Sequence, residues 1–130
     1  MSIGSRKITY ASVTPRNNEV LIRMEFEESV MSIFSGDAKS SLNENPRFFV
    51  AAVGPKVTDL PVGTEVFMKG QEYSNIEMAS NPQSISSLHD FYKSLKPSEY
   101  NAIISDKEKS RVKVVQYGLF PEFTIKAIVS

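Results

Sequence analysis

Four side chains that could perform hydrolysis stand close together in the sequence: Ser86, Ser87, His89 and Asp90. A Ser-His-Asp triad is defined by its geometry in space, with the imidazole between the nucleophile and the carboxylate, and proximity in sequence does not produce that geometry. The serines precede an apolar run with helical spacing, which is the position that helix N-cap residues occupy. We therefore expect no catalytic residues, and we interpret His89 as a surface residue.

Metal and cofactor sites would have few possible ligands. The chain has no Cys and a single His, which excludes thiolate sites and histidine-rich zinc sites. Gly4 and the Gly54-Pro55 pair do not form a phosphate-binding glycine pattern. The tyrosines are scattered without the basic residues that a base-stacking surface needs. The sequence thus predicts neither a cofactor nor an enzyme.

Charge excludes some kinds of partner. Lys plus Arg and Asp plus Glu both number 15, so the formal net charge is zero, whereas proteins that bind nucleic acid usually carry a basic excess. Residues 25–45 are nonetheless acidic and residues 109–126 basic. These stretches are either solvated faces or complementary sides of neighbouring subunits in a ring. We expect no nucleic-acid partner.

Targeting and membrane segments are not indicated by the sequence. No run approaches the roughly 18 consecutive apolar residues of a membrane span, and the first residues lack the apolar segment of a secretory signal. We therefore expect a cytoplasmic protein without a membrane partner.

The elements that would position any site are mostly strands. Strands are predicted at residues 20–27, where apolar and polar residues alternate, at 48–53, which is apolar throughout and reads as buried on both faces, and at 65–68, 111–117 and 123–129. Short strands separated by Gly and Pro turns are typical of a small β-barrel. We predict an all-β fold and a single domain over residues 1–130.

Residues 70–110 interrupt this pattern. Ile85, Leu88, Tyr92 and Leu95 recur at helical spacing, and Pro97 is expected to end the helix. A second short helix is expected from residue 98 to residue 104. We interpret the region as a short helical insertion, and the sequence leaves its role open.

The stretch from residue 28 to residue 45 is long for a loop and rich in small polar residues, and it contains an apolar island: Val30, Met31, Ile33 and Phe34. Either the island is a short edge strand or a loop that packs back on the core of its own chain, or it is a docking peptide that becomes ordered in a partner's groove. Burial of a large apolar side chain contributes roughly 1.5–3 kcal/mol, and ordering one loop residue costs roughly 1–2 kcal/mol. A single docking peptide would bind weakly, whereas an oligomer that displays several copies would bind firmly.

The ordered set of motifs resembles the GroES co-chaperonin family. Residues 13–22 (VTPRNNEVLI) are similar to the family's opening strand, and SIFSG at 32–36 occupies the place of its hydrophobic tripeptide. The remaining motifs are FVAAVGP at 49–55, VGTEVF at 62–67 and IKAIV at 125–129. Together they cover about two thirds of the chain.

The resemblance implies a small, partly open GroES-like β-barrel that assembles into a homo-oligomeric ring, usually a heptamer. Residues 28–45 would be a mobile loop that docks on the apical domains of a GroEL-like chaperonin and caps its folding chamber. Ile33 and Phe34 would be the anchors, assisted by Val30 or Met31. Neighbouring subunits would be joined by their terminal strands, with interface residues Ile8, Tyr10, Ile125, Ala127 and Val129.

The chain departs from the family pattern at two places, the shortened roof segment 55–61 and the insertion at 70–110. Such departures resemble bacteriophage-encoded versions, which would act in the host cytoplasm with a capsid protein as client. The alternative is a bacteriophage virion structural or decoration protein on the same barrel, with the island as a permanent subunit contact. The zinc alcohol dehydrogenases, which share the barrel, are rejected because their Cys and His ligands and their Rossmann domain are missing.

Overall fold

The computed structural model describes residues 6–8, 13–36, 46–68, 74–78 and 81–129. The strands in this part are β1 (Arg6–Ile8), β2 (Glu19–Ser29), β3 (Arg47–Val53), β4 (Glu65–Met68), β5 (Ser74–Met78), β6 (Arg111–Pro121) and β7 (Ile125–Ile128). The helices are α1 (Val30–Ser35), α2 (Ile85–Lys93) and α3 (Pro97–Ile104), with a single 3-10 turn η2 (Glu122–Thr124) before β7. The expectation of a β-rich fold with a few short helices is confirmed.

The strands form one sheet in the order β1-β5-β6-β2-β3-β4-β7. Every pair of neighbours is antiparallel except β1 and β5, which are parallel. In the described ranges β1 pairs only with β5 and β7 only with β4. The sheet is therefore open and is not closed into a barrel.

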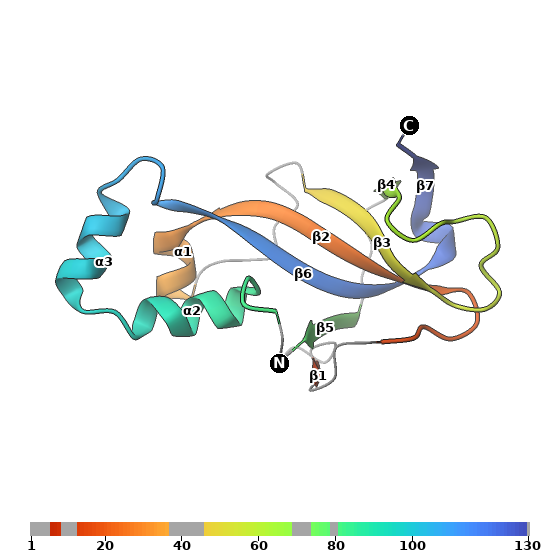
Figure 1. Ribbon diagram of the computed structural model, residues 1–130, viewed down its shortest axis with the longest axis horizontal. Coiled ribbons are helices and arrows are strands. Elements are labelled where there is room, and N and C mark those ends of the chain that lie inside the picture. The colour runs from red at the N-terminus through yellow and green to blue at the C-terminus, as the bar shows by residue number, and fades with distance from the viewer. Residues whose placement is uncertain (1–5, 9–12, 37–45, 69–73, 79–80, 130) are drawn as a thin grey trace.

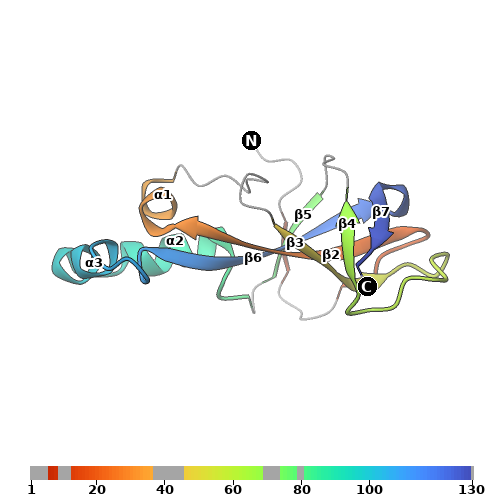
Figure 2. The ribbon, with the colours of Figure 1, turned by 90° about the horizontal axis from the view of Figure 1, so that it is seen from above.

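A long ribbon formed by β2 and β6 is the axis of the molecule (Figure 1). Each strand has 11 residues, and the register runs without a break from Glu19 opposite Pro121 to Ser29 opposite Arg111. Strands β5 and β1 lie on one side of this ribbon and β3, β4 and β7 on the other (Figure 1). Helices α1, α2 and α3 gather at its far end (Figures 1 and 2).

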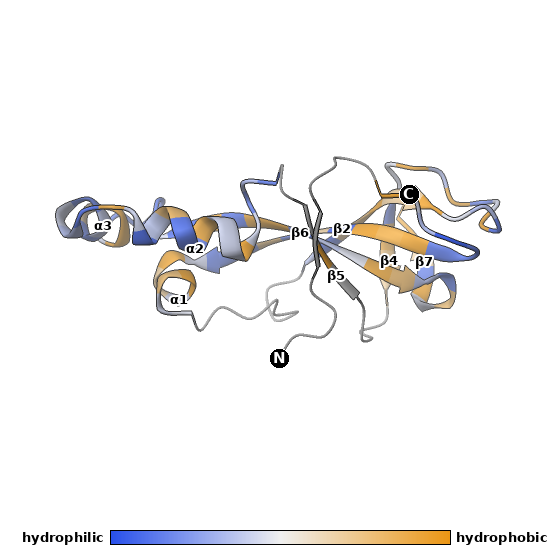
Figure 3. Ribbon diagram, turned by 90° about the horizontal axis from the view of Figure 1, so that it is seen from below, coloured by the Kyte–Doolittle hydropathy of each residue, from blue (hydrophilic) through white to orange (hydrophobic). Residues whose placement is uncertain are grey.

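The alternation along β2 produces two hydrophobic clusters on one face of the ribbon. Figure 3 shows apolar stretches, coloured orange, along β2 and in α1. Val20, Ile22 and Met24 are buried in the first cluster, which also contains side chains of β3, β4 and the β3–β4 loop. Phe26, two positions farther along β2, belongs to the second cluster, which it forms with α1, α2 and Val114. The prediction of a half-buried strand at residues 20–27 is confirmed, because successive side chains of a strand point to opposite faces.

The prediction that β3 is buried on both faces is confirmed only at its end, where Ala51 and Ala52 pack against Leu21 and Ile76. Only Val50 is fully buried among the seven residues of this strand. The opposite face of β3 carries Arg47 and Phe49, which contact charged side chains of β2 and β4. A continuous apolar run in the sequence does not show that one face of the strand is partly exposed when aromatic and small residues occupy that face.

The helices in residues 70–110 lie where the helical spacing predicts them. Ser84 is the N-cap of α2, and its side chain accepts a hydrogen bond from the backbone N–H of Ser87. Pro97 is the first residue of α3, a position where its missing N–H costs nothing. This region also contains β5, which the sequence analysis missed.

Residues 70–110 also contribute to the hydrophobic core. Leu88 and Tyr92, one turn apart on α2, are buried in the second cluster together with Phe26 and Val114. The region therefore supplies a large part of the second core. We call α1, α2, α3 and this second cluster the helical lobe.

Candidate functional site

The apolar island forms helix α1 and packs against its own chain. Val30 and Ile33, three residues apart on one face of the helix, are both 0% exposed. The helix begins after Ser29, where the backbone N–H of Val30 donates to the carbonyl oxygen of Ser110, and it ends at Gly36, which has a φ of 82°. A left-handed glycine is a common helix terminator. Of the two alternatives left open by the sequence, the structure supports the island packed back on its own core.

The four predicted docking residues do not form one exposed surface. The ring of Phe34 stacks on Tyr100 of α3 at a centroid distance of 4.1 Å, and the Lys93 ammonium lies 4.0 Å from the Phe34 centroid. Only Met31 is largely exposed, at 58%. The expectation that Ile33 and Phe34 stand outside the core is corrected, because α2 and α3 provide the apolar surface that covers them. Residues 37–45 of the predicted loop lie outside the described residues.

The predicted interface residues lie at the two ends of the sheet. The backbone of Ile8 lies in β1, and Tyr10 falls outside the described residues. Ile125 is half-buried and packs against the first cluster, whereas Ala127 is exposed. Val129 follows β7, and its N–H donates to the carbonyl oxygen of Glu65. The terminal strands are thus the two edge strands of the described sheet.

The outer edge of β7, the side that faces away from β4, has a geometry that follows from the register. Val129 stands opposite Glu65 and donates to it, and Val66 then pairs with Ile128. Hydrogen-bonded and non-hydrogen-bonded pairs alternate along an antiparallel ladder. The backbone N–H and C=O of Ile128 therefore point away from β4, toward the outer edge.

Three large apolar side chains of β4, η2 and β7 are exposed. Phe67 of β4 is 60% exposed, Phe123 of η2 is 71% exposed and Ile128 is 48% exposed. The sequence analysis did not select any of them. For Phe67 a signal was present, because it alternates with the buried Val66 in a strand of only four residues.

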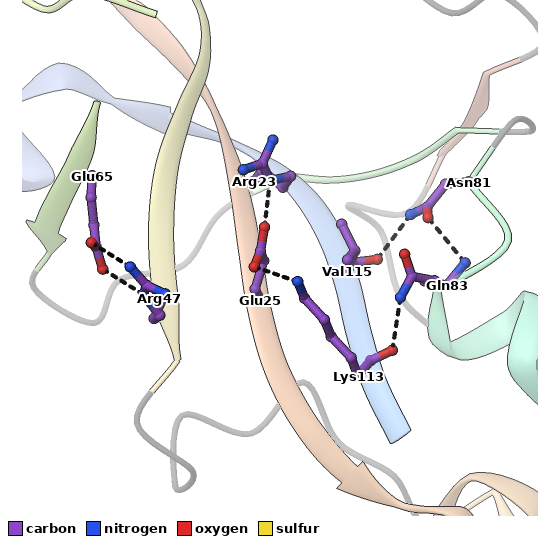
Figure 4. A network of polar contacts seen from close by, with 8 residues as sticks. All are labelled: Arg23, Glu25, Arg47, Glu65, Asn81, Gln83, Lys113 and Val115. Atoms are coloured by element: carbon purple, nitrogen blue, oxygen red, sulfur yellow. Dashed lines mark hydrogen bonds and ion pairs between the residues drawn. The ribbon is translucent and has the colours of Figure 1, made fainter. Parts of the chain in front are cut away.

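The acidic and basic stretches of the sequence face each other within the chain. Strand β2 ends in the acidic stretch and β6 begins in the basic one, and their register places Glu27 opposite Lys113. The Lys113 ammonium lies 2.9 Å from one Glu25 carboxylate oxygen, and Arg23 Nε lies 2.8 Å from the other (Figure 4). At these residues the complementary charges join two strands of one subunit rather than neighbouring subunits.

A second ion pair continues this row of charges across β3 and β4. Arg47 donates to both carboxylate oxygens of Glu65, at 2.8 and 2.9 Å (Figure 4). The Phe49 ring has the Arg23 guanidinium 4.8 Å and the Arg47 guanidinium 5.1 Å from its centroid. We call this face, with Arg23, Glu25, Arg47, Phe49, Glu65 and Lys113, the charged face of the sheet. All of its charged groups are paired with one another, so it offers no unpaired group for chemistry.

The stability of the charged face is expected to depend on pH through Glu25. Burial favours the neutral carboxyl, but the hydrogen bond from Lys113 and the charge of Arg23 outweigh it, so the pKa of Glu25 lies below its ordinary value of 4.5. A lowered pKa stabilises the fold above the ordinary value, and this stabilisation disappears as the pH falls through the folded-state pKa. We expect Lys113→Met to lower the free energy of unfolding at neutral pH, and the difference from the wild type to shrink below pH 4.5.

Denaturant unfolding at several pH values measures this difference. Lys107→Met, at an exposed turn position, is the matched control and should show no such pH dependence. A Lys113→Met effect that is the same at pH 7 and at acidic pH would contradict the role of the Glu25 charge.

The residues with possible hydrolytic chemistry do not assemble into a triad. The Ser87 hydroxyl donates to the carbonyl oxygen of Asn81. His89 Nδ1 and a carboxylate oxygen of Asp90 are 3.7 Å apart, too far for a hydrogen bond. No group of three or more His, Cys, Asp or Glu side chains that could hold a metal ion occurs among the residues that the structure describes. Among the helices in the same residues, none has the length and apolar character needed to cross a bilayer.

Comparisons with known proteins give no match: no family model, no curated protein and no solved structure is significantly similar to this chain.

Proposed function

We propose that this chain is a structural subunit that assembles edge to edge with copies of itself, as a virion structural or decoration protein would. The observation that carries the proposal is the outer edge of β7, where outward-pointing backbone groups lie beside Phe67, Phe123 and Ile128. An exposed strand edge of this kind favours pairing with another strand. Exposed apolar residues beside it add the surface that association would bury.

The directions of the edge strands favour a second copy as the occupant. Following the pairings from β1 through β5, β6, β2, β3 and β4, β7 runs opposite to β1. When two copies are placed side by side in the same orientation, β7 of one therefore meets β1 of the next in antiparallel direction. Such a head-to-tail contact produces a ring if the rotation closes and a filament if it does not. It would also extend the open sheet, in place of the partly open barrel within one chain that the GroES resemblance implies.

Substitution of Ile128 tests this contact. Ile128→Pro removes the outward-pointing N–H of β7 while leaving its hydrogen bonds to β4 in place. We expect the purified protein to change from an oligomer to a monomer, as measured by sedimentation velocity over a range of concentrations. Ile128→Ala, which keeps the N–H and shortens the side chain, is the matched control and should weaken the oligomer less. A wild-type protein that is monomeric at all concentrations, or an Ile128→Pro oligomer of unchanged mass, would contradict the proposal.

Docking on a chaperonin through the island is the weaker alternative. Exposing both Val30 and Ile33 would cost roughly 3–6 kcal/mol, which is a large part of the roughly 5–15 kcal/mol that stabilises a typical domain. Without such opening, only Met31 is available as an apolar contact on α1. A chaperonin pull-down that retains the wild type and loses Met31→Asp would favour the co-chaperonin function over the structural one.

A further inference from the structure

Strand β6 has a second edge that could also accept a strand. One side of β6 pairs with β2 along its whole length. The other side pairs with β5 only at Tyr117, Gly118 and Leu119. At Lys113 and Val115 this side would present backbone donors and acceptors that could pair with a foreign strand.

The segment from Asn81 to Gln83 occupies this part of the edge. The N–H of Val115 donates to the carbonyl oxygen of Gln83 at 3.0 Å, and Asn81 Nδ2 donates to the carbonyl oxygen of Val115 at 2.8 Å. Gln83 Nε2 donates to the carbonyl oxygen of Lys113 at 3.4 Å (Figure 4). Two side-chain amides and one backbone carbonyl thus make three of the hydrogen bonds that a neighbouring strand would make, at Lys113 and Val115.

The segment is itself fixed by local hydrogen bonds. The N–H of Gln83 donates to Asn81 Oδ1 at 3.1 Å, and the Ser87 hydroxyl donates to the carbonyl oxygen of Asn81 at 3.1 Å. Ser84, the next residue, is 3% exposed and caps α2. Because the helix cap and the edge contacts share one short turn, α2 holds the two amides against β6.

We propose that Asn81 and Gln83 form an edge plug that prevents a second copy of the chain from adding a strand to β6. A side-chain carboxamide makes hydrogen bonds to the backbone of a strand edge but offers no second row of backbone groups to another strand. The sheet therefore ends there. A second copy is the occupant to be excluded, because an open strand edge can pair with a strand of the same chain. In the wild type, subunits that meet through β7 would also bring their strands to high local concentration. This last step rests on the proposed function: the plug confines assembly to the outer edge of β7 and to β1.

The test removes the two side-chain amides of the plug, which supply the donors to Lys113 and Val115, in a chain whose outer edge at β7 is also blocked. Asn81→Ala and Gln83→Ala are combined with Ile128→Pro, and the triple variant is compared with Ile128→Pro alone by sedimentation velocity. We expect the weight-average mass to shift from one subunit to multiples of it. Asn101→Ala, an exposed amide on α3, is the control in the same background and should leave the mass unchanged.

The outcomes separate the two proposals. A folded triple variant with the same mass as Ile128→Pro would overturn the edge plug, whatever the wild-type mass. An Ile128→Pro protein with the wild-type oligomer mass would overturn the proposed assembly. The difference in mass between Ile128→Pro and the triple variant would still show whether the two amides prevent strand addition to β6. If circular dichroism shows the triple variant unfolded, Asn81→Asp with Gln83→Glu, which removes both amide donors at constant size, replaces it under the same criteria.

Discussion

Replacing Ile33 by Ala is expected to lower the free energy of unfolding by about 2–5 kcal/mol, the range found for large-to-small substitutions in protein cores. The side chain is 0% exposed and packs in the second cluster with Leu88 and Tyr92 of α2. Its truncation leaves a cavity that the surrounding helices can fill only in part. Chemical denaturation followed by circular dichroism measures the change.

Met31 provides the control for this prediction on the same helix. Its side chain is 58% exposed, so Met31→Ala should change stability by no more than about 0.5 kcal/mol. A small effect at both positions would contradict the burial of the island. It would instead support a loop that leaves the surface to bind a partner.

Replacing Gly54 by Ala is expected to lower the free energy of unfolding by about 1–3 kcal/mol, the typical effect of adding atoms to a close-packed site. A Cβ atom at Gly54 would overlap with the carbonyl oxygen of Asn17. That carbonyl accepts a hydrogen bond from the N–H of Lys56, and the N–H of Gly54 donates to Glu19, so the two turns are joined at this point. The clash is with backbone atoms, which cannot move without breaking these bonds.

Gly63→Ala separates the steric effect from glycine's conformational freedom. Gly63 has a φ of 92° and open space where a Cβ would stand, so its substitution should cost only the roughly 1–2 kcal/mol of a left-handed residue. Thermal or denaturant unfolding of both variants gives the comparison. Equal losses of unfolding free energy for Gly54→Ala and Gly63→Ala would show that the close contact between Gly54 and Asn17 does not restrict the side chain at position 54.

Periodicity predicted most of the elements because their burial is one-sided. The alternation over Val20–Phe26 and the helical spacing of Leu88 and Tyr92 each reflect one face turned to a core. Strand β4 and helix α3 were also placed within a residue of their ends. Strand β5 was missed because its residues, SNIEM, contain little apolar pattern, although Ile76 is buried against Leu21.

The candidate site was less predictable because it depends on contacts between segments that are far apart in the sequence. The island lies in a stretch of small polar residues that resembles an exposed loop. Only the position of α2, more than 50 residues later, shows that Val30 and Ile33 are covered. The same pairing brings the acidic end of β2 against the basic start of β6. Strand order, which no local motif encodes, places β1 and β7 at the two edges.

The most direct test of edge-to-edge assembly is energy transfer between β7 of one chain and β1 of another. The sequence has no Cys, so Lys7→Cys and Lys126→Cys each provide a unique site for a donor or an acceptor dye. A mixture of donor-labelled Lys7→Cys and acceptor-labelled Lys126→Cys chains is predicted to show strong transfer, which unlabelled wild-type protein competes away. Acceptor at Glu108→Cys, in the turn between α3 and β6, should give weaker transfer. Absence of transfer between positions 7 and 126 in a protein at oligomer-forming concentration would contradict the account.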